Sequence, residues 1–390
     1  MSTLTTYPIV AAIYMLALLT FLRFVSGLWQ EYTFVRDITY WLALDRRAGT
    51  FINGMICSED FLYFLLVIVL FVTLSILRLQ AERTKLSALQ SMLRYGGVIV
   101  VTLLIGYFSA RPALRCYYDA TEMKENTLTQ NSIDIMEKLD GPLTITTYAN
   151  MFDENYFRAL PRYYNEDFNR FEKYIRFKPE IKMKYVYYYD KTNNPTLEQR
   201  YPGLTDEQRL KKICDALDWD VKRVLTPEQI RAKEDLSGEY NKYVRVIERG
   251  NGQKSYLRLY EDNYRHPTET EISAALKRMV IKSPVVAFLT GHGERSIDGI
   301  GERDYYAFSQ YKDFRNSLVN QGFESISLSL DSVNKVPENI DILVISDVRT
   351  ALSPKEQEII ENYIAEGRNL LIAGETRRQE QMNPLLAPLG

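Results

Sequence analysis

One uncharged run dominates the N-terminal part of this chain. Residues 61–77 contain no charged side chain and approach the ~20 apolar residues that a helix needs to cross a bilayer. Two further apolar runs, 9–25 and 95–110, reach that length when the arginines at their ends extend toward the membrane surface. The sequence therefore predicts a membrane domain at 1–111 with about three transmembrane helices. A signal peptide is disfavoured as the interpretation of the 9–25 run, because no Lys or Arg precedes that run.

Basic residues in short loops mark the cytoplasmic side of a membrane protein. The 78–94 linker has one acid, Glu82, and these basic residues: Arg78, Arg83, Lys85 and Arg94. We therefore expect this linker in the cytoplasm and everything after residue 111 outside it. The 26–60 loop would then also lie outside, which conflicts with the rule because it contains Arg36, Arg46 and Arg47.

The balance of charges and the scarcity of metal-binding side chains exclude several functions. Lys and Arg number 48 against 50 Asp and Glu, so the net charge of -2 gives no reason to expect a nucleic acid as partner. Cys57, Cys116 and Cys214 form no CxxC pair, and only two histidines are present. A disulfide framework, a metal site and a cofactor are therefore not expected.

After Tyr117 the chain alternates strand-like and helical segments, which predicts an α/β region of two open-sheet units with parallel strands and covering helices. The first domain is expected at 112–282, with an insertion at about 190–255. Its expected helices lie at 128–139, 155–175 and 269–280, its strands at 143–148 and 181–187, and the insertion contains helices at 206–217 and 227–234 and a hairpin at 250–252. Pro161 would lie near the start of the 155–175 helix or kink it.

The second α/β unit is expected at 283–390. It starts with the continuous apolar run Val285–Leu289, which suits a strand buried on both faces. Further strands are expected at 323–328, 340–345 and 369–373, with a helix at 305–320. Ser353, Pro354 and Glu356 predict a capping box for a helix that ends at Gly367. This order predicts a doubly wound sheet of Rossmann or flavodoxin type, truncated at its C-terminus within a further helix.

The most pointed motif, Gly291-His292-Gly293-Glu294, follows the buried strand directly. Ligands bind at this edge of open α/β sheets, so these four residues are candidates for a ligand-binding or partner-binding site. His292 would be a contact or an acid/base with Glu294 as its partner, and Asp298, Glu302 and Asp304 follow closely. In the alternative, which we favour, the glycines form a turn and the two side chains bond within the loop.

Nucleotide-binding motifs are missing from the sequence. The third glycine of GxGxxG would fall at Ser296, and Gly250–Ser255 lacks the spacing of a P-loop. The sequence also has no GxSxG elbow and no cysteine in the context of a nucleophile. We therefore expect no ATP hydrolysis by this chain.

Several segments together resemble the GldG-like auxiliary proteins of ABC transporters, a group named from bacterial gliding motility. The resembling segments are Thr127–Ser132, Leu139–Thr146, Glu271–Arg278, Gly291–Glu294, Asp341–Ile345 and Leu352–Ser353. Residues 51–83 look like the terminal helix of an ABC-2 type permease, although Asn53 departs from that pattern. The second α/β unit resembles a domain shared with intraflagellar-transport proteins.

The resemblance implies a non-ATPase component of an ABC transporter whose partners are an ATPase subunit and permease subunits. It also implies that the protein is embedded in the lipid bilayer of the bacterial inner membrane. It implies no catalytic residue and no cofactor. Two other classes remain open. One is an enzyme that acts on envelope glycans through His292 and Glu294, and the other is a membrane-anchored scaffold without a transporter partner.

Overall fold

The computed structural model describes residues 7–25, 30–84, 87–109 and 115–389. The chain forms two compact units. The first comprises residues 1–129 and 158–179, and the second comprises residues 130–157 and 180–390. Lys85 and Arg111, used above to predict topology and span length, lie outside the described residues, as do the side chains of Arg46 and Glu82.

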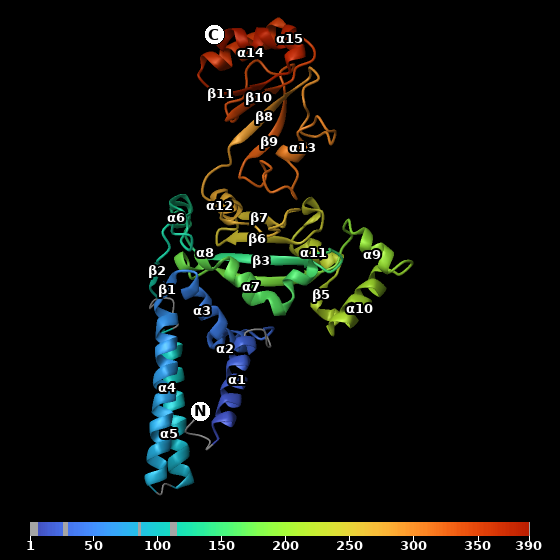
Figure 1. Ribbon diagram of the computed structural model, residues 1–390. Coiled ribbons are helices and arrows are strands. Elements are labelled where there is room, and N and C mark those ends of the chain that lie inside the picture. The colour runs from blue at the N-terminus through green and yellow to red at the C-terminus, as the bar shows by residue number, and fades with distance from the viewer. Residues whose placement is uncertain (1–6, 26–29, 85–86, 110–114, 390) are drawn as a thin grey trace. The chain divides into compact units, whose positions relative to one another are not determined.

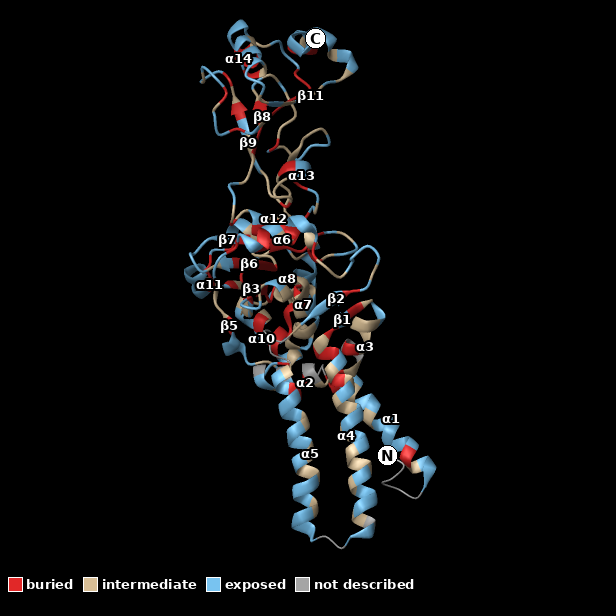
Figure 2. Cartoon of the chain, turned by 90° about the vertical axis from the view of Figure 1, so that its left-hand side faces the viewer, coloured by how far each residue is buried: buried red, intermediate tan, exposed pale blue. Residues whose placement is uncertain are grey.

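The first unit contains two long apolar helices (Figure 1). α4 (Ser58–Arg83) and α5 (Ala88–Ser109) are long and apolar enough to cross a membrane, and Figure 2 shows them exposed along most of their length. They contain the runs predicted at 61–77 and, up to Ser109, at 95–110. α1 (Pro8–Phe24) contains most of the run predicted at 9–25. It has only 17 residues, a length of about 25 Å against a hydrocarbon core of about 30 Å.

A two-stranded ribbon connects the chain before α4 with the chain after α5. β1 (Met55–Cys57) runs directly into α4 and pairs antiparallel with β2 (Tyr117–Asp119). The two ends therefore lie on the same side, as an antiparallel pair of helices requires. α2 (Thr33–Leu42) and α3 (Leu44–Ile52) lie near this end of α4 and α5 in both views (Figures 1 and 2).

The prediction of one continuous helix at 155–175 is wrong. The segment contains four short pieces: η3 (Tyr156–Ala159), η4 (Pro161–Tyr163), α7 (Tyr164–Arg170) and α8 (Glu172–Phe177). Pro161 has no N–H to donate and keeps Leu160 in extended backbone, with φ −65° and ψ 148°. A second bend falls at Phe171, whose side chain is fully buried.

The larger sheet of the second unit is mixed, whereas the sequence pattern predicted a parallel one. Its order is β5-β4-β3-β6-β7. The strands are β3 (Leu143–Asn150), β4 (Lys182–Tyr188), β5 (Val224–Leu225), β6 (Val244–Arg249) and β7 (Lys254–Arg258). β3, β4 and β5 are parallel, while β6 pairs antiparallel with both β3 and β7.

The segment 190–255, expected as an insertion, supplies β5, β6 and the start of β7 to this sheet. Its alternation of charged and apolar residues concealed that β6 lies beside the central strand β3. α10 (Asp206–Leu217) and α11 (Pro227–Lys233) lie at the expected positions, and each begins with a threonine capping box. The remaining helices here are α6 (Gln130–Glu137), α9 (Pro195–Arg200) and α12 (Glu269–Lys277), with η5 (Val221–Arg223) and η6 (Ser237–Glu239) between them.

The second sheet is parallel throughout, with the order β11-β10-β8-β9. Its strands are β8 (Val285–Thr290), β9 (Glu324–Ser329), β10 (Ile342–Ser346) and β11 (Asn369–Ala373). α14 (Pro354–Ala365) begins with the predicted Ser353–Glu356 capping box, and Gly367 follows its end at φ +69°. The chain ends in η7 (Thr376–Arg378), α15 (Gln379–Leu386) and η8 (Ala387–Leu389).

The helix predicted at 305–320 is reduced to α13 (Tyr306–Ser309). Asn320 explains part of the difference, because its side-chain amide donates to the backbone carbonyls of Lys312 and Phe314 at 2.9 and 2.8 Å. A side chain that takes backbone carbonyls in this way competes with the helical ladder. Residues 310–321 therefore form a compact irregular segment instead.

Candidate functional site

The Gly291–Glu294 loop follows β8 at the carboxyl edge of the parallel sheet. Gly291 and Gly293 have φ values of +124° and +73°, which residues with a Cβ rarely adopt. A Cβ on Gly293 would lie 3.1 Å from the side chain of Arg349. The carbonyl of His292 accepts the backbone N–H groups of Arg349 and Thr350 at 2.8 and 3.1 Å. The loop is therefore bound closely to the segment that follows β10.

The side chain of His292 lies between two buried carboxylates. Nδ1 is 3.4 Å from Oε1 of Glu294, and Nε2 is 3.2 Å from Oε2 of Glu356. The imidazole is 11% exposed, and the two carboxylate side chains are 2% and 5% exposed. Glu294 also accepts the backbone N–H of His292 at 2.6 Å. The structure thus brings His292 and Glu294 together and adds Glu356, which the sequence analysis had placed only in a helix cap.

Glu356 has two tasks in this arrangement. It accepts the backbone N–H and the hydroxyl of Ser353 at 2.8 and 2.6 Å, which closes the capping box of α14. Burial by itself raises the pKa of Glu356, but the hydrogen bonds from Ser353 and the contact with His292 outweigh burial and lower the pKa below its ordinary value of 4.5. The carboxylate is therefore ionised while it faces the imidazole.

This geometry favours a structural contact between the loop after β8 and the start of α14 over a catalytic site. Both ring nitrogens of His292 face carboxylates, so neither points to open solvent. Asp304 accepts the backbone N–H of Gly301, and Asp298 accepts the hydroxyl of Ser327, so neither joins His292, and Glu302 is exposed. Among the described residues, no group of three or more His, Cys, Asp or Glu side chains is arranged to bind a metal ion.

A cluster of ion pairs at the same edge was not predicted. Asp347 follows β10 directly, is 3% exposed at its side chain and has φ +58°. Its carboxylate contacts Arg303 and lies 3.3 Å from Nε of Arg378. Glu375, which follows β11, pairs with Arg295 and Arg303 at 3.1 and 2.8 Å. Asp347 could have been found from the sequence, because it follows the carboxyl end of a parallel strand as the Gly291–Glu294 loop does. Its arginine partners are scattered along the sequence and give no such signal.

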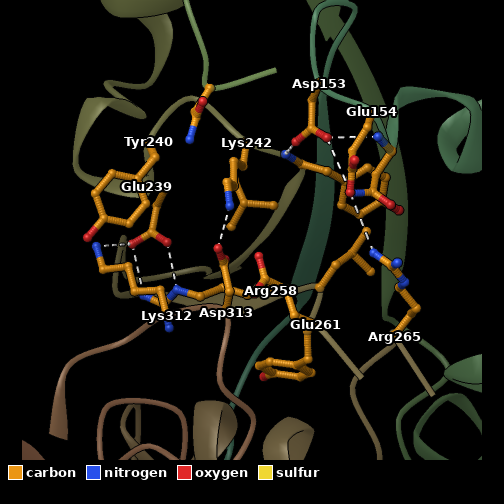
Figure 3. A pocket seen from close by; sticks show the side chains of 16 residues that line it. Asp153, Glu154, Glu239, Tyr240, Lys242, Arg258, Glu261, Arg265, Lys312 and Asp313 are labelled. Atoms are coloured by element: carbon orange, nitrogen blue, oxygen red, sulfur yellow. Dashed lines mark hydrogen bonds and ion pairs between the residues drawn. The ribbon is translucent and has the colours of Figure 1, made fainter. Parts of the chain in front are cut away.

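A cavity of about 160 Å³ is a second candidate in the second unit (Figure 3). Its walls come from the loop after β3, the start of β6, the end of β7 and residues 312–313. Arg258 donates to both oxygens of Glu239, at 2.6 and 2.8 Å, and Lys312 lies 3.0 Å from the same carboxylate. Lys242 pairs with Asp313. Sequence reasoning missed this site because its walls come from distant segments.

The charged groups labelled in Figure 3 mostly compensate one another. Two carboxylates have other partners: Asp153 is buried and accepts the backbone N–H groups of Asn155 and Tyr243 at 2.7 and 2.6 Å, and Glu261 accepts the hydroxyl of Tyr311 at 2.9 Å. Burial raises the pKa of Asp153 despite these hydrogen bonds. The cavity therefore has a polar, internally paired lining, which suits cohesion between the segments that form it.

One part of the chain matches a known protein family. Residues 283–387 match the model of a family described as an ABC-type uncharacterized transport system, the ABC transporter auxiliary family. No curated protein and no solved structure matched the chain. The matched segment contains the parallel sheet, the Gly291–Glu294 loop and Asp347. This match supports an auxiliary protein of an ABC-type transport system.

Proposed function

We propose that this chain is a membrane-anchored, non-ATPase component of an ABC-type transport system, with a large extracytoplasmic region used for binding or assembly. The observation that carries the proposal is the family match at 283–387 in a chain that also has two helices long enough to cross a membrane. The proposed partners are an ABC ATPase subunit and permease subunits. The proposed location is the bacterial inner membrane, with residues after 111 outside the cytoplasm.

The contacts of two arginines support this topology. Arg47 is fully buried and pairs with Glu59 and Asp60 at 2.8 and 2.6 Å. Arg36 lies over the ring of Tyr164, at 5.7 Å from its centroid. Arg47 therefore does not act as a free positive charge, and the conflict between the 26–60 loop and the positive-inside rule becomes smaller.

The fold of residues 283–389 supports a binding role of the GldG-like kind. β8 lies between β9 and β10, the next two strands along the chain, and this is the strand order of a flavodoxin-like sheet. The chain reverses direction across the sheet beside β8, where the Gly291–Glu294 loop and Asp347 lie. In this proposal the paired groups at that edge keep the domain rigid for assembly, and an enzyme acting through His292 and Glu294 is the less favoured alternative.

Cysteine labelling tests the topology. Cys214 is fully buried and unsuitable as a probe, whereas Cys116 is exposed, so a Cys116→Ser background is needed. Asn251→Cys lies in the exposed turn between β6 and β7, and Thr84→Cys provides the matched control in the linker after α4. A membrane-impermeant maleimide should label Asn251→Cys in intact spheroplasts and Thr84→Cys only after lysis. The opposite pattern would reject the proposed orientation.

Copurification tests the assembly. The full chain should copurify with an ATP-binding subunit, and the complex should hydrolyse ATP only while that subunit has an intact Walker motif. The chain purified alone should be inactive because its sequence lacks a P-loop. Hydrolysis by the isolated chain would refute the non-ATPase assignment, and a chain that binds no ATPase subunit in its native membrane would favour the scaffold alternative.

A further inference from the structure

α2 presents two large apolar side chains outward, unlike a helix on the surface of a soluble protein. Among the α2 side chains that the structure describes, Phe34 and Ile38 are 76% and 43% exposed. Positions i and i+4 share one face of a helix, so these two residues form an exposed apolar stripe. Arg36 and Thr39 face the protein instead, since Arg36 contacts Tyr164 and Thr39 is buried. Soluble proteins place such apolar stripes toward their core.

Contacts on its protein side fix the orientation of α2. Gln30 is 4% exposed and donates to the carbonyl of Arg162 at 3.0 Å. Its side-chain oxygen accepts the backbone N–H of Asn165, also at 3.0 Å. Together with the contact between Arg36 and Tyr164, these hydrogen bonds attach the segment just before α2 and the first turn of α2 to residues 158–179 of the same unit. The apolar stripe is therefore held outward.

The position of α2 within the first unit identifies what covers the stripe. Figures 1 and 2 both show α2 near the end of α4 and α5 where β1 and β2 lie. α4 starts there with the buried acids Glu59 and Asp60, and its exposed apolar surface begins at Phe61. If α4 and α5 cross a bilayer, one surface of that bilayer lies near the end of these helices that adjoins β1 and β2. Tyr32, next to α2 and 60% exposed, adds the type of aromatic residue that is enriched at membrane surfaces.

We propose that α2 is an interfacial helix whose Phe34–Ile38 stripe is inserted into the headgroup and acyl boundary of the bilayer that α4 and α5 cross. The inference rests on the proposed membrane function. Ten residues give a length of about 15 Å, so α2 lies in the plane of the interface and does not span the membrane. The bilayer fits the position better than a partner protein, because α2 lies near α4 and α5, whose own apolar side chains are exposed along most of their length.

Site-directed fluorescence in a bilayer tests this inference. An environment-sensitive fluorophore is attached to Phe34→Cys in the full chain with Cys116→Ser, reconstituted alone into nanodiscs. Val72 lies in the middle of α4 and its side chain is 53% exposed, so a fluorophore on Val72→Cys reports on the spanning helix. Asn251→Cys is the aqueous control. At position 34 we expect blue-shifted emission, quenching by lipids spin-labelled near the headgroup, and loss of most quenching by aqueous iodide.

The possible outcomes separate the inference from the function on which it rests. Quenching of position 34 by iodide, with position 72 quenched by lipids labelled deep in the acyl chains, would overturn the interfacial helix and leave the membrane function intact. Protection of position 34 only after permease subunits are added would also overturn it and make the stripe a protein docking surface. If position 72 itself is quenched by iodide, the proposed membrane function fails.

Discussion

Nε2 of His292 lies 3.2 Å from Oε2 of Glu356, so the loop after β8 is joined to the first turn of α14. The contact links two elements that meet at the carboxyl edge of the sheet but lie more than sixty residues apart in the sequence. Since Glu356 also caps α14 through Ser353, the imidazole contributes to both the loop and the helix terminus. Perturbation of either residue is therefore expected to affect both elements.

Substitution of His292 tests whether this contact is structural. His292→Ala leaves the buried carboxylates of Glu294 and Glu356 without the imidazole, which should lower the free energy of unfolding by about 1–3 kcal/mol. Chemical denaturation of the purified chain measures the change, and Glu302→Ala, an exposed position in the same loop region, should have little effect. A His292→Ala protein with unchanged stability that no longer assembles would instead establish the loop as a binding site.

The lowered pKa of Glu356 predicts a pH dependence. A carboxyl group whose pKa is lower in the folded state contributes stability above the pKa of the unfolded state, and this contribution is lost as the pH falls through the folded value. The stability difference between wild type and Glu356→Gln should therefore be largest above pH 4.5 and decrease below it. Thermal unfolding at a series of pH values measures both proteins, and a difference that grows toward acid would contradict the assignment.

The buried position of Arg47 predicts a large effect of its removal. Arg47→Met leaves Glu59 and Asp60, 9% and 4% exposed at their side chains, without their buried partner, and loss of one member of such a pair costs about 3–5 kcal/mol. Arg115→Met is the matched control, because Arg115 is 29% exposed and pairs with Glu59 from the surface side. Unfolding in nanodiscs should rank Arg47→Met well below this control, and equal stabilities would refute the role assigned to Arg47.

Arg315 connects the irregular segment 310–321 to α12 and to the residues between β7 and α12. It pairs with Asp262 and Glu271, each at 2.6 Å, and donates to the carbonyl of His266 at 3.0 Å. Arg315→Ala should lower stability by about 2 kcal/mol, because a mostly buried carboxylate, Glu271, loses a charged partner. Lys335→Ala removes an exposed ion pair with Glu338 and should change stability by less than about 0.5 kcal/mol. Calorimetry of both variants provides the comparison.

The strands of the second sheet lie within one residue of their predicted bounds, except that β10 starts two residues later. β8 and β10 are mostly buried apolar runs, as parallel strands covered on both faces require, and the edge strand β11 contains the apolar run Leu370–Ala373. α10, α11 and α14 start where threonine or serine forms a capping box, a signal contained in four adjacent residues. Each of these features depends on residues that are adjacent in the sequence, which is why it could be predicted from the sequence.

The features that sequence reasoning missed depend on residues far apart in the chain. β1 and β2 are too short for a periodic pattern, and they pair across the two long helices. Arg303 reaches Asp347 and Glu375 from another loop, so no spacing in the sequence indicates the cluster. The position of Gly291–Glu294 at a strand end was predicted from the strand itself, whereas Glu356 as the second carboxylate beside His292 required the packing of α14 against that loop.

The β1–β2 ribbon determines how α4 is able to move. Because α4 begins at the residue after β1, a piston-like displacement of α4 along its axis would pull β1 past β2. Slipping the register by one residue would turn Met55 and Cys57 outward and Ile56 inward, which reverses the buried and exposed faces of β1. The ribbon therefore resists sliding of α4 along its own axis, whereas tilt or rotation of α4 and α5 together with the ribbon leaves the β1–β2 register intact.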